Sequence, residues 1–391
     1  MRTADLALQR DKYKHLSDEE WRWMLQQVEG RERTADKLPA FAALEDWWYP
    51  VRLSCEQCSS EATARYKASI VHDKCPNGNC LDLTGGYGVD TYFLSEQFAH
   101  TDYVEQNEEL CRIAAHNFSL IPNRKPINIH HSTAEEFIQT AGQYDLIFLD
   151  PARRDSHGGK VFRLEDCTPD VSELLPTLLA HLAPDGRVLL KLSPMLDLSQ
   201  AVNALSATAW DIYVVAVKNE VKEVLLLSGG AGRITAIDLA KTDQTFTFTR
   251  EEEKNSEAVC QPEGRSVLCQ ARPVFLYEPN AAILKAGAYK LVAERFGLYK
   301  LDVNTHLYCS ETLVPDFPGR VWRVIQSFKD RKDLPADLQQ ANILTRNYPL
   351  TPDQLKKKLH LRDGGTAFII GCRLSGKPTL FYSVVGTTAS L

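Results

Sequence analysis

The sequence predicts an α/β fold in which a mostly parallel sheet carries helices on both faces. Apolar runs of strand length alternate with helical patterns from residue 51 to about residue 230, an alternation that builds parallel sheets through right-handed crossovers. A glycine-rich stretch, LDLTGGYGVD (residues 81–90), ends the first of these runs. The last two runs lie too close together for a crossover, so they predict an antiparallel hairpin at the edge of the sheet.

Length and composition limit the number of units and the class of protein. The chain has 391 residues, 44% of them apolar and 25% charged, which predicts roughly two to four globular units. No apolar run approaches the roughly 18 to 20 residues that span a bilayer, and the first residues lack the apolar core of a signal peptide. We therefore expect a cytoplasmic protein without a membrane partner.

Charge is distributed unevenly along the chain. The net charge is −6, which argues against a protein covered with nucleic-acid-binding surface. Residues 316–391, however, hold twelve Lys and Arg against six Asp and carry +6, so the rest of the chain carries −12. The sequence therefore predicts a basic module that follows an acidic body.

The expected elements begin with a helical segment over residues 1–50, in which Ser17 is the predicted N-cap of the helix DEEWRWMLQQV. The predicted strands that follow are CLDLT (80–84), TDYVEQ (101–106), INIHH (127–131), YDLIFLD (144–150), GRVLLKLS (186–193), DIYVVAVKN (211–219) and KEVLLLSG (222–229). Between them lie the helical patterns NEELCRIAAHNF (107–118), AEEFIQTA (134–141) and SELLPTLLAHLA (172–183).

The last part of the chain mixes both kinds of element. Residues 231–315 combine alternating polar residues with the helix-like NAAILKAGAYKLVAERF (280–296), which predicts either an α+β unit or an extension of the sheet. Thr351 is expected to cap a helix with Pro352 in its first turn. The elements predicted here are RVWRVIQSF (320–328), the helix PDQLKKKLHL (352–361), TAFIIGCRL (366–374) and TLFYSVVG (379–386).

The glycine-rich turn is placed to face a ligand, because ligands of open parallel sheets bind beyond the carboxyl ends of the strands. A dinucleotide fingerprint, G-x-G-x-x-G, is incomplete, since Thr91 occupies its third position. The stretch instead resembles the first motif of class I S-adenosylmethionine-dependent methyltransferases, an acidic residue followed by spaced glycines. This resemblance implies cofactor binding by Asp82, Thr84, Gly85, Gly86 and Gly88, with Thr84 in place of the motif's first glycine.

The next two strand ends add candidate residues for the same site. Glu105 follows Gly86 by nineteen residues, where an acidic side chain can accept hydrogen bonds from both ribose hydroxyls of a nucleoside. Gln106 comes next, and the resemblance places the loop Ser132–Thr133–Ala134 beside the adenine, with Ser132 in place of the usual acid. Taken singly, Glu105 is better explained as an exposed strand end and Ser132 as a helix N-cap, but together with the glycine turn and YDLIFLDP they favour the site.

The fourth strand ends in DPARRD (residues 150–155), beside the first strand and therefore close to the transferable methyl group. We expect Asp150, Pro151 and Arg153 to act at the acceptor. Asp150 would orient the acceptor and take its proton, while Arg153 would neutralise phosphate or hold the loop. Direct transfer requires mainly alignment of the reacting atoms.

Two alternatives concern this strand end. Arg153 and Arg154 could belong to an exposed loop, paired with Asp155 and Glu165. A covalent mechanism would need a cysteine nucleophile, and Cys167 is the nearest candidate thiol. Direct transfer is favoured, because no cysteine follows the fifth strand, where such enzymes carry one.

Four segments together carry a family resemblance over nearly the whole chain: EQCSSEATARYKA (56–68), LDLTGGYGVD, DPARRD and ANILTRNYPLTPDQLKKKL (341–359). The chain resembles a bacterial, Bacteroides-type family of class I methyltransferases with ferredoxin-like and THUMP-like C-terminal domains. That resemblance implies a Rossmann-like catalytic sheet, S-adenosyl-L-methionine as cofactor and RNA (tRNA or rRNA) as partner. Phosphate contacts are then expected from Arg346, Lys356, Lys357, Lys358 and Arg362, although the lysines also fit an exposed helix face.

The predicted organisation has four parts: a helical segment (1–50), a methyltransferase core (51–235), a ferredoxin-like segment (236–315) and a THUMP-like domain (316–391). The ten cysteines are expected to be free thiols, because nothing indicates export. Cys55, Cys58, Cys75 and Cys80 could in principle hold zinc. Packing is favoured, since Cys58 lies at the predicted start of a helix, and no metal is expected.

The function predicted from these features is methylation of a base nitrogen in structured RNA by direct transfer from S-adenosylmethionine. Two alternatives remain. One is a small-molecule methyltransferase whose C-terminal module only covers the pocket. The other is a nonenzymatic RNA-binding protein with a vestigial nucleotide pocket.

Overall fold

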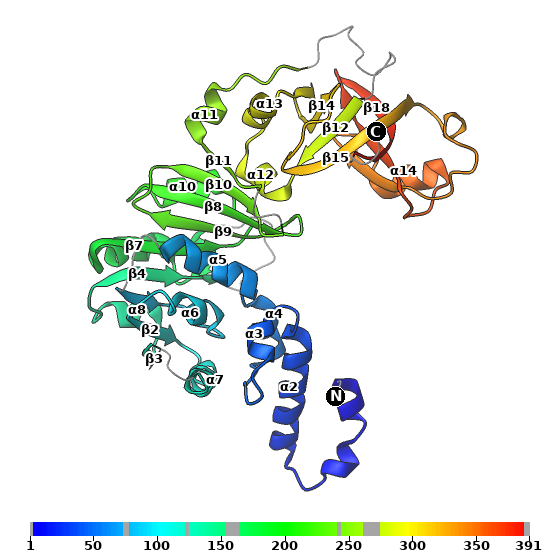
Figure 1. Cartoon of the computed structure of the whole chain (residues 1–391). Coiled ribbons are helices and arrows are strands. Elements are labelled where there is room, and N and C mark those ends of the chain that lie inside the picture. The colour runs from blue at the N-terminus through cyan, green and yellow to red at the C-terminus, as the bar shows by residue number, and fades with distance from the viewer. Residues whose placement is uncertain are drawn as a thin grey trace. The chain divides into compact units, whose positions relative to one another are not determined.

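The computed structural model of this protein describes residues 3–72, 78–121, 125–153, 164–240, 244–260 and 274–386. The chain divides into two compact units, residues 1–212 with 223–231 and residues 213–222 with 232–391. Figure 1 shows the N-terminal helices and a large sheet in the first part of the chain, and a second sheet in its C-terminal part.

The N-terminal helices form as the sequence predicts. Ser17 accepts a hydrogen bond from the Glu20 N–H, and the Glu20 carboxylate accepts one from the Ser17 N–H, which completes a capping box. Phe41 and Trp47 of this segment pack into one core with Tyr87 and Phe93, which lie in and after the glycine-rich turn. The helices are α1 (Thr3–Ala7), η1 (Arg10–Tyr13), α2 (Asp18–Thr34), α3 (Pro39–Ala42), α4 (Arg52–Gln57) and α5 (Glu61–His72).

A nine-stranded sheet has the order β11-β10-β8-β9-β7-β4-β1-β2-β3. Strands β3, β2, β1, β4 and β7 are parallel to one another, and β9 is antiparallel to β7, which confirms the predicted α/β class. The strands are β1 (Asn79–Asp82), β2 (His100–Glu105), β3 (Ile127–His131), β4 (Tyr144–Leu149), β7 (Leu182–Leu192), β8 (Trp210–Val217), β9 (Glu220–Ser228), β10 (Arg233–Asp238) and β11 (Phe246–Thr249).

Helices connect the parallel strands. Asn107 caps α7 by accepting a hydrogen bond from the Leu110 N–H, and Thr133 caps α8. Ser132 is therefore not the N-cap that the sequence offered as an alternative. The connecting elements are α6 (Val89–Leu94), α7 (Glu108–Ser119), α8 (Ala134–Ile138), β5 (Ala152–Arg153), η2 (Leu164–Asp166), β6 (Cys167–Thr168), α9 (Val171–Ala180) and α10 (Leu198–Ala204).

The predicted hairpin is formed by β8 and β9 around the turn Lys218–Asn219, whose residues have φ of 52° and 64°, but it does not lie at the edge of the sheet. Strands β10 and β11 continue the sheet beyond β8 and pair antiparallel with each other. Phe246 and Phe248 are buried while Thr247 between them is exposed, the alternation of a half-buried strand. Both possibilities left open for residues 231–315 occur: β10 and β11 extend this sheet, and residues 250–310 contribute helices and strands to a second sheet.

The second unit contains a seven-stranded sheet in the order β13-β14-β12-β15-β18-β17-β16. Its strands are β12 (Val274–Pro279), β13 (Tyr299–Asp302), β14 (Thr305–Ser310), β15 (Gly319–Phe328), β16 (Asn342–Arg346), β17 (Ala367–Leu374) and β18 (Lys377–Val385). The helices described in this unit are α11 (Arg250–Asn255), α12 (Ala281–Ala286), α13 (Leu291–Phe296), η3 (Arg331–Asp333) and α14 (Pro352–Leu359).

Two helix predictions in this unit have different outcomes. Thr351 caps α14 with Pro352 in its first turn, as predicted. The helix-like pattern over residues 280–296 instead forms two short helices. Gly287 has φ of 86°, and this left-handed conformation ends α12. The expectation of one helix there is wrong, because a glycine with apolar neighbours satisfies a helical pattern and still ends the helix.

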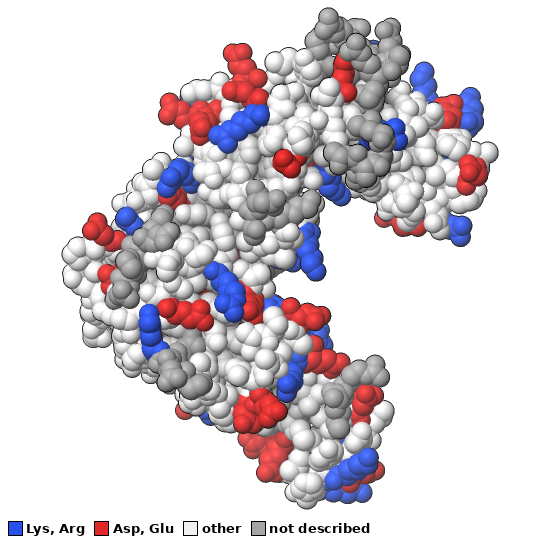
Figure 2. Space-filling view, viewed as in Figure 1, with Lys and Arg blue, Asp and Glu red and all other residues white. Residues whose placement is uncertain are grey.

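No helix within the described ranges is long and apolar enough to cross a membrane. On the face seen in Figure 2, basic and acidic side chains are interspersed, and neither sign forms a continuous surface.

Candidate active site

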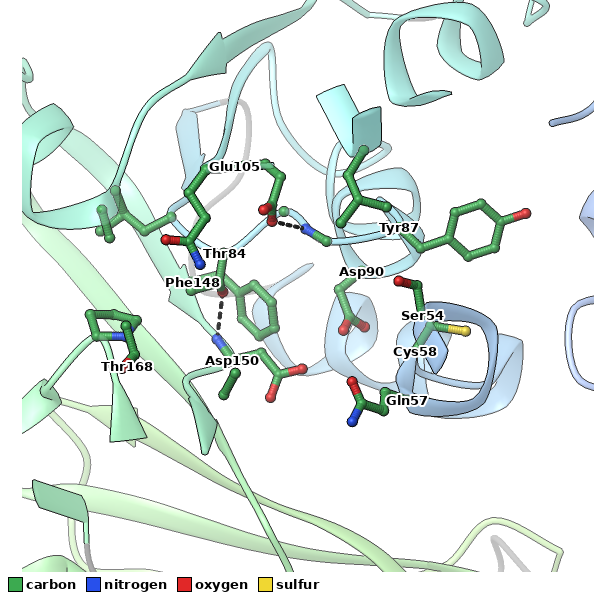
Figure 3. A pocket seen from close by; sticks show the side chains of 18 of the residues that line it. Ser54, Gln57, Cys58, Thr84, Tyr87, Asp90, Glu105, Phe148, Asp150 and Thr168 are labelled. Atoms are coloured by element: carbon green, nitrogen blue, oxygen red, sulfur yellow. Dashed lines mark hydrogen bonds between the residues drawn. The ribbon is translucent and has the colours of Figure 1, made fainter. Parts of the chain in front are cut away.

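A cavity of about 260 Å³ lies in the first unit, beyond the carboxyl ends of β1, β2, β3 and β4. The loops that follow these strands line one part of it, and α4 with the residues after it lines another (Figure 3). The lining residues on which the site depends are Gln57, Ser59, Thr84, Gly85, Gly86, Asp90, Glu105, Ser132 and Asp150.

Two glycines allow the turn after β1 to fold tightly. A Cβ atom on Gly85 would lie 2.1 Å from a ring carbon of Tyr103, so no side chain fits there. Gly86 has φ of 54°, in the left-handed region, and its carbonyl accepts a hydrogen bond of 2.6 Å from the Tyr103 hydroxyl. The turn therefore presents bare backbone to the cavity.

Glu105 faces the cavity from the end of β2, and its carboxylate is fixed by the backbone. One oxygen accepts a hydrogen bond of 2.8 Å from the Gly86 N–H (Figure 3), and the other accepts one of 2.8 Å from the Asn107 N–H. Each carboxylate oxygen has a second lone pair, so both oxygens can still accept a hydrogen bond from a ligand. This geometry suits two adjacent hydroxyls.

Asp82 lies behind the turn and does not line the cavity. Its carboxylate accepts hydrogen bonds from the Thr84 N–H (3.0 Å) and the Thr91 hydroxyl (2.6 Å), joining the turn to α6. Burial raises the pKa of Asp82 to about 7, although these two hydrogen bonds lower it. The position of Asp82 is that of a residue that shapes the turn.

Thr84 connects the two central strand ends. Its hydroxyl accepts a hydrogen bond of 2.7 Å from the Asp150 N–H (Figure 3). A glycine at this position, as the motif usually has, could not make this bond. The substitution therefore links the cofactor side of the cavity to the strand end that is expected to hold the acceptor.

The carboxylates of Asp90 and Asp150 point into the same part of the cavity (Figure 3). The ammonium of Lys191, at the end of β7, makes an ion pair with Asp150 and lies 3.8 Å from an Asp90 oxygen. Burial alone would lower the pKa of Lys191, but Asp150, Asp90 and Glu223 outweigh it and hold that pKa above its usual range. Lys191 is therefore a cation between the two acids.

Further charges lie behind Asp90. Lys67 of α5 is fully buried, and its ammonium lies 3.2 Å from Asp90 and 2.6 Å from Glu223 of β9. The Ser59 hydroxyl donates a hydrogen bond of 2.7 Å to Asp90. Burial works against the charge on Asp90, yet Lys67 and Lys191 lower its pKa overall.

The sequence singled out neither lysine, and both interrupt apolar patterns. Lys67 shares a helix face with Ala64, Ala68 and Val71, which are buried. Lys191 lies in the apolar run VLLKL (188–192). A lysine on an otherwise buried face requires a partner, and this signal could have indicated the cluster.

Four cysteines were considered as zinc ligands. Cys55 donates its thiol hydrogen to the Pro50 carbonyl and Cys58 to the Cys55 carbonyl, and burial raises the pKa of Cys55 to about 12. Cys75 lies outside the described residues. Within the part of the chain that the structure describes, no group of three or more His, Cys, Asp and Glu side chains could hold a metal ion.

The structure brings most of the predicted site residues together. Those that line the cavity are Thr84, Gly85, Gly86, Glu105, Gln106, Ser132, Thr133, Ala134 and Asp150. Asp82, Gly88 and Pro151 lie close to these in the chain but do not line it. The side chain of Arg153 and the whole of Arg154 are outside the described residues. Cys167 is buried beside Thr168 and Pro169, which line the cavity. The predicted role of each residue stays a prediction.

The predicted phosphate-binding residues belong to the second unit. Lys357 and Lys358 on α14, and Arg362 after it, have exposed side chains. Lys356 makes ion pairs with Asp353 (3.2 Å) and Asp363 (2.6 Å). Arg346 pairs with the buried Glu278, which also binds Arg320. Lys357, Lys358 and Arg362 are therefore the better placed to contact a phosphate.

Comparison with known proteins finds two adjacent domain families in the C-terminal part of the chain and relatives over nearly its whole length. A ferredoxin-like domain family matches residues 275–318, and a THUMP domain-like family matches residues 319–383. The crystal structure of a "putative methyltransferase" from Porphyromonas gingivalis W83 has a TM-score of 0.82 with this chain at 32% identity, covering 95% of this chain and 92% of that one. Proteins from two strains of Mycobacterium tuberculosis, named uncharacterized S-adenosylmethionine-dependent methyltransferases, are 23% identical and cover 90% of this chain and 92% of their own length.

The cavity itself agrees with this similarity. Glu105 has the geometry to bind two ribose hydroxyls, and Gly86 leaves its backbone open, since a Cβ atom there would meet nothing closer than the Thr84 carbonyl at 3.8 Å. The similarity to the Porphyromonas protein extends over nearly the full length of both chains. The chain therefore belongs to a bacterial family of class I S-adenosylmethionine-dependent methyltransferases with ferredoxin-like and THUMP-like C-terminal domains.

Proposed function

We propose that this protein methylates structured RNA, a tRNA or an rRNA, by direct transfer from S-adenosylmethionine. The observation that carries the RNA substrate is the THUMP domain-like match over residues 319–383, in a chain whose other unit holds a methyltransferase cavity. The net charge of +6 on residues 316–391 agrees with a polyanionic partner. The proposal includes the domain organisation predicted from the sequence: a helical segment (1–50), a methyltransferase core (51–235), a ferredoxin-like segment (236–315) and a THUMP-like domain (316–391).

The cofactor would lie between the ends of β1, β2 and β3. Glu105 would accept hydrogen bonds from its ribose hydroxyls, the turn Thr84–Gly86 would allow close approach, and Ser132–Ala134 would border its adenine. When bound, S-adenosylmethionine supplies an electrophilic methyl group carried on a sulfonium. The protein's task is then to hold an acceptor in line with that group, which can contribute roughly 7 to 11 kcal/mol.

Asp150 would hold the acceptor. Its side chain is 38% exposed and faces the cavity, so it can form a hydrogen bond to an incoming group. A base nitrogen is the acceptor that the sequence favours, and the Asp150 carboxylate would then bind its amino hydrogens. The covalent alternative gains no support, because Cys167 is buried and does not line the cavity.

The test uses the purified full-length chain and S-adenosylmethionine with a labelled methyl group. We expect label to enter total RNA from a strain that lacks the gene and to become soluble after ribonuclease treatment. RNA from the parent strain is the control and should accept little label, because its sites are already modified. Label that enters only a small-molecule extract would contradict the RNA substrate.

Asp150→Ala is the matched variant. It should keep its affinity for S-adenosylmethionine in calorimetry, because Asp150 lies on the acceptor side, and lose transfer. Unchanged transfer would contradict the proposed acceptor site. Binding of S-adenosylmethionine weaker than millimolar by the unaltered chain would instead favour the nonenzymatic alternative.

A further inference from the structure

A row of alternating charges leads from the cavity into the interior of the first unit. In order they are Asp150, Lys191, Asp90, Lys67 and Glu223. The exposed fraction of the side chains falls along this row, from 38% at Asp150 to 12% at Lys191 and 0% at Lys67. Five different segments contribute one residue each: the end of β4, β7, α6, α5 and β9.

The stability of the fold does not explain why these charged residues are buried in a row. Removing each charge from water costs several kcal/mol, and apolar residues of similar volume usually hold neighbouring elements together at least as well. Buried charges of both signs that end at a ligand cavity are instead typical of sites that act on a substrate. The row ends at Asp150, the residue expected to meet the acceptor.

The positive charge beside Asp150 affects two classes of acceptor, nitrogen and hydroxyl oxygen, in opposite ways. A nitrogen that attacks a methyl sulfonium gains positive charge, which a neighbouring ammonium disfavours. A hydroxyl oxygen must lose its proton and gains negative charge, which an ammonium stabilises in a site sheltered from water. Lys191 does not line the cavity itself, but its ion pair places this ammonium directly beside Asp150, which lines the cavity and offers a carboxylate that can take the proton.

We infer that the acceptor is a hydroxyl group, the ribose 2′-hydroxyl of the RNA, in place of the base nitrogen that the sequence favours, and that Lys191 is the cation that favours it. The inference rests on the proposed RNA substrate, in which every internal nucleotide offers this hydroxyl. The oxygen forms a bond to the methyl carbon as the carbon–sulfur bond breaks, and the electron pair of that bond stays on sulfur. The hydroxyl proton passes to the Asp150 carboxylate and from there to water.

Lys67 and Glu223 act as positioning residues in this arrangement. Glu223 accepts hydrogen bonds of 2.6 Å and 2.8 Å from Lys67, and Lys67 in turn lies 3.2 Å from Asp90. Asp90 is also fixed by Ser59, so it forms a rigid second anion beside Lys191. Lys191 is thereby held between Asp90 and Asp150.

The product identifies the acceptor. RNA from a deletion strain and from its parent is digested to nucleosides and compared by mass spectrometry. We expect the deletion strain to lack one 2′-O-methylnucleoside, and alkaline cleavage to appear at that position, because the methyl group blocks attack by the 2′-oxygen. Loss of a base-methylated nucleoside would overturn the hydroxyl inference and leave the RNA substrate standing. An unchanged nucleoside pattern would overturn both.

Lys191→Met tests the charge. It keeps the length of the side chain and should lower kcat at least about 100-fold, as the loss of one charge-stabilising group does. Affinity for S-adenosylmethionine in calorimetry and the KM for RNA should stay within about threefold, because the cofactor side is untouched. Lys191→Arg should restore part of the rate. A rate for Lys191→Met that equals or exceeds the unaltered one would indicate a nitrogen acceptor and overturn the inference.

Lys67 needs a second variant, because Lys67→Met alone leaves Glu223 buried without a partner. The double change Lys67→Met with Glu223→Gln removes both charges and should lower transfer about 10- to 100-fold through misplacement of Lys191. Lys222→Met is the control, since Lys222 lies next to Glu223 but is 42% exposed. A double variant that transfers at the normal rate would mean that this pair is only structural.

Discussion

Thr84 is the position at which the turn departs from its usual glycine, and its hydroxyl explains the departure. It accepts the Asp150 N–H at 2.7 Å, so it holds the two central strand ends together. Thr84→Val keeps the shape of the side chain but leaves that N–H without a partner. We expect a loss of about 1 to 3 kcal/mol in the free energy of unfolding, measured by urea denaturation.

Thr84→Ser is the control for this prediction, because it retains the hydroxyl and should stay close to the unaltered chain. Thr84→Val should also slow methyl transfer, since Asp150 would no longer be fixed. Equal stability of the valine and serine variants would mean that the hydrogen bond contributes nothing.

Asp82 gives a prediction on pH. Burial raises its pKa to about 7 from 3.8, so between these values the folded chain keeps a proton that the unfolded chain has lost. The free energy of unfolding should therefore fall as pH rises through this window and level off above it. From pH 5 to pH 7 the contribution of Asp82 is roughly 2 to 3 kcal/mol.

Asp82→Asn removes this ionisation and can keep both hydrogen bonds, because the Thr91 hydroxyl can accept where it previously donated. We expect denaturant curves of this variant to depend less on pH between 5 and 7 than those of the unaltered chain. Asp11→Asn, at an exposed position, is the control. An Asp82→Asn variant with the full pH dependence would assign that dependence to other groups.

The position of a single residue in the site could be predicted from the sequence where it depends only on the backbone and on the order of the strands. Gly86 and Glu105 are nineteen residues apart, at the ends of adjacent strands, so their proximity follows from the fold, and a hydrogen bond joins them. Lys67 and Glu223 are 156 residues apart and meet only through packing of α5 on the sheet. The sequence around either residue does not indicate which residue it pairs with.

At the scale of elements, the turn after β1 depends on one close approach. Gly85 faces the ring of Tyr103 in the neighbouring strand, and a Cβ atom there would lie 2.1 Å from it. Gly85→Ala must therefore displace either the ring or the turn, and Tyr103 also binds the Gly86 carbonyl. We expect weaker binding of S-adenosylmethionine, at least about tenfold by calorimetry, with a lower melting temperature.

Gly142→Ala is the matched control, because a Cβ atom on Gly142 would meet nothing within 4 Å and its backbone is not left-handed. It should leave both measurements unchanged. A Gly85→Ala variant that binds the cofactor normally would mean that the turn tolerates the displacement.

Elements also differ in how far the sequence determines them. Caps at Ser17 and Thr351 were predictable, because the bonds are local. The contribution of α4 to the cavity was not predictable, because Ser54 and Gln57 line it through tertiary packing of the N-terminal segment against Tyr87. Trp47 donates a hydrogen bond of 2.8 Å to the Tyr87 hydroxyl, and this contact fixes the segment beside the turn.

At the scale of the whole molecule, the predicted α/β core and its family are confirmed, and the charge is distributed unevenly along the chain. An overall charge of −6 gives no general attraction for RNA, so the proposed binding of RNA would have to come from local groups. The ferredoxin-like and THUMP domain-like matches share the seven-stranded sheet, since β12 and β15 are adjacent in it. The proposed RNA contact by α14 would therefore be made from a unit in which both matched domains belong to one sheet.

The last prediction concerns the basic residues on and after α14. Lys357, Lys358 and Arg362 are exposed, whereas Lys356 and Arg346 are held in ion pairs. Replacing these three exposed residues with alanine should weaken binding of RNA and reduce the slope of log K against log salt by roughly 2 to 3, because each phosphate contact contributes about 0.7 to 0.9. Lys12→Ala with Lys14→Ala removes exposed charges elsewhere and is the control. If both sets of changes reduced the slope equally, the electrostatic contact would be unspecific, and α14 would have no special part in RNA binding.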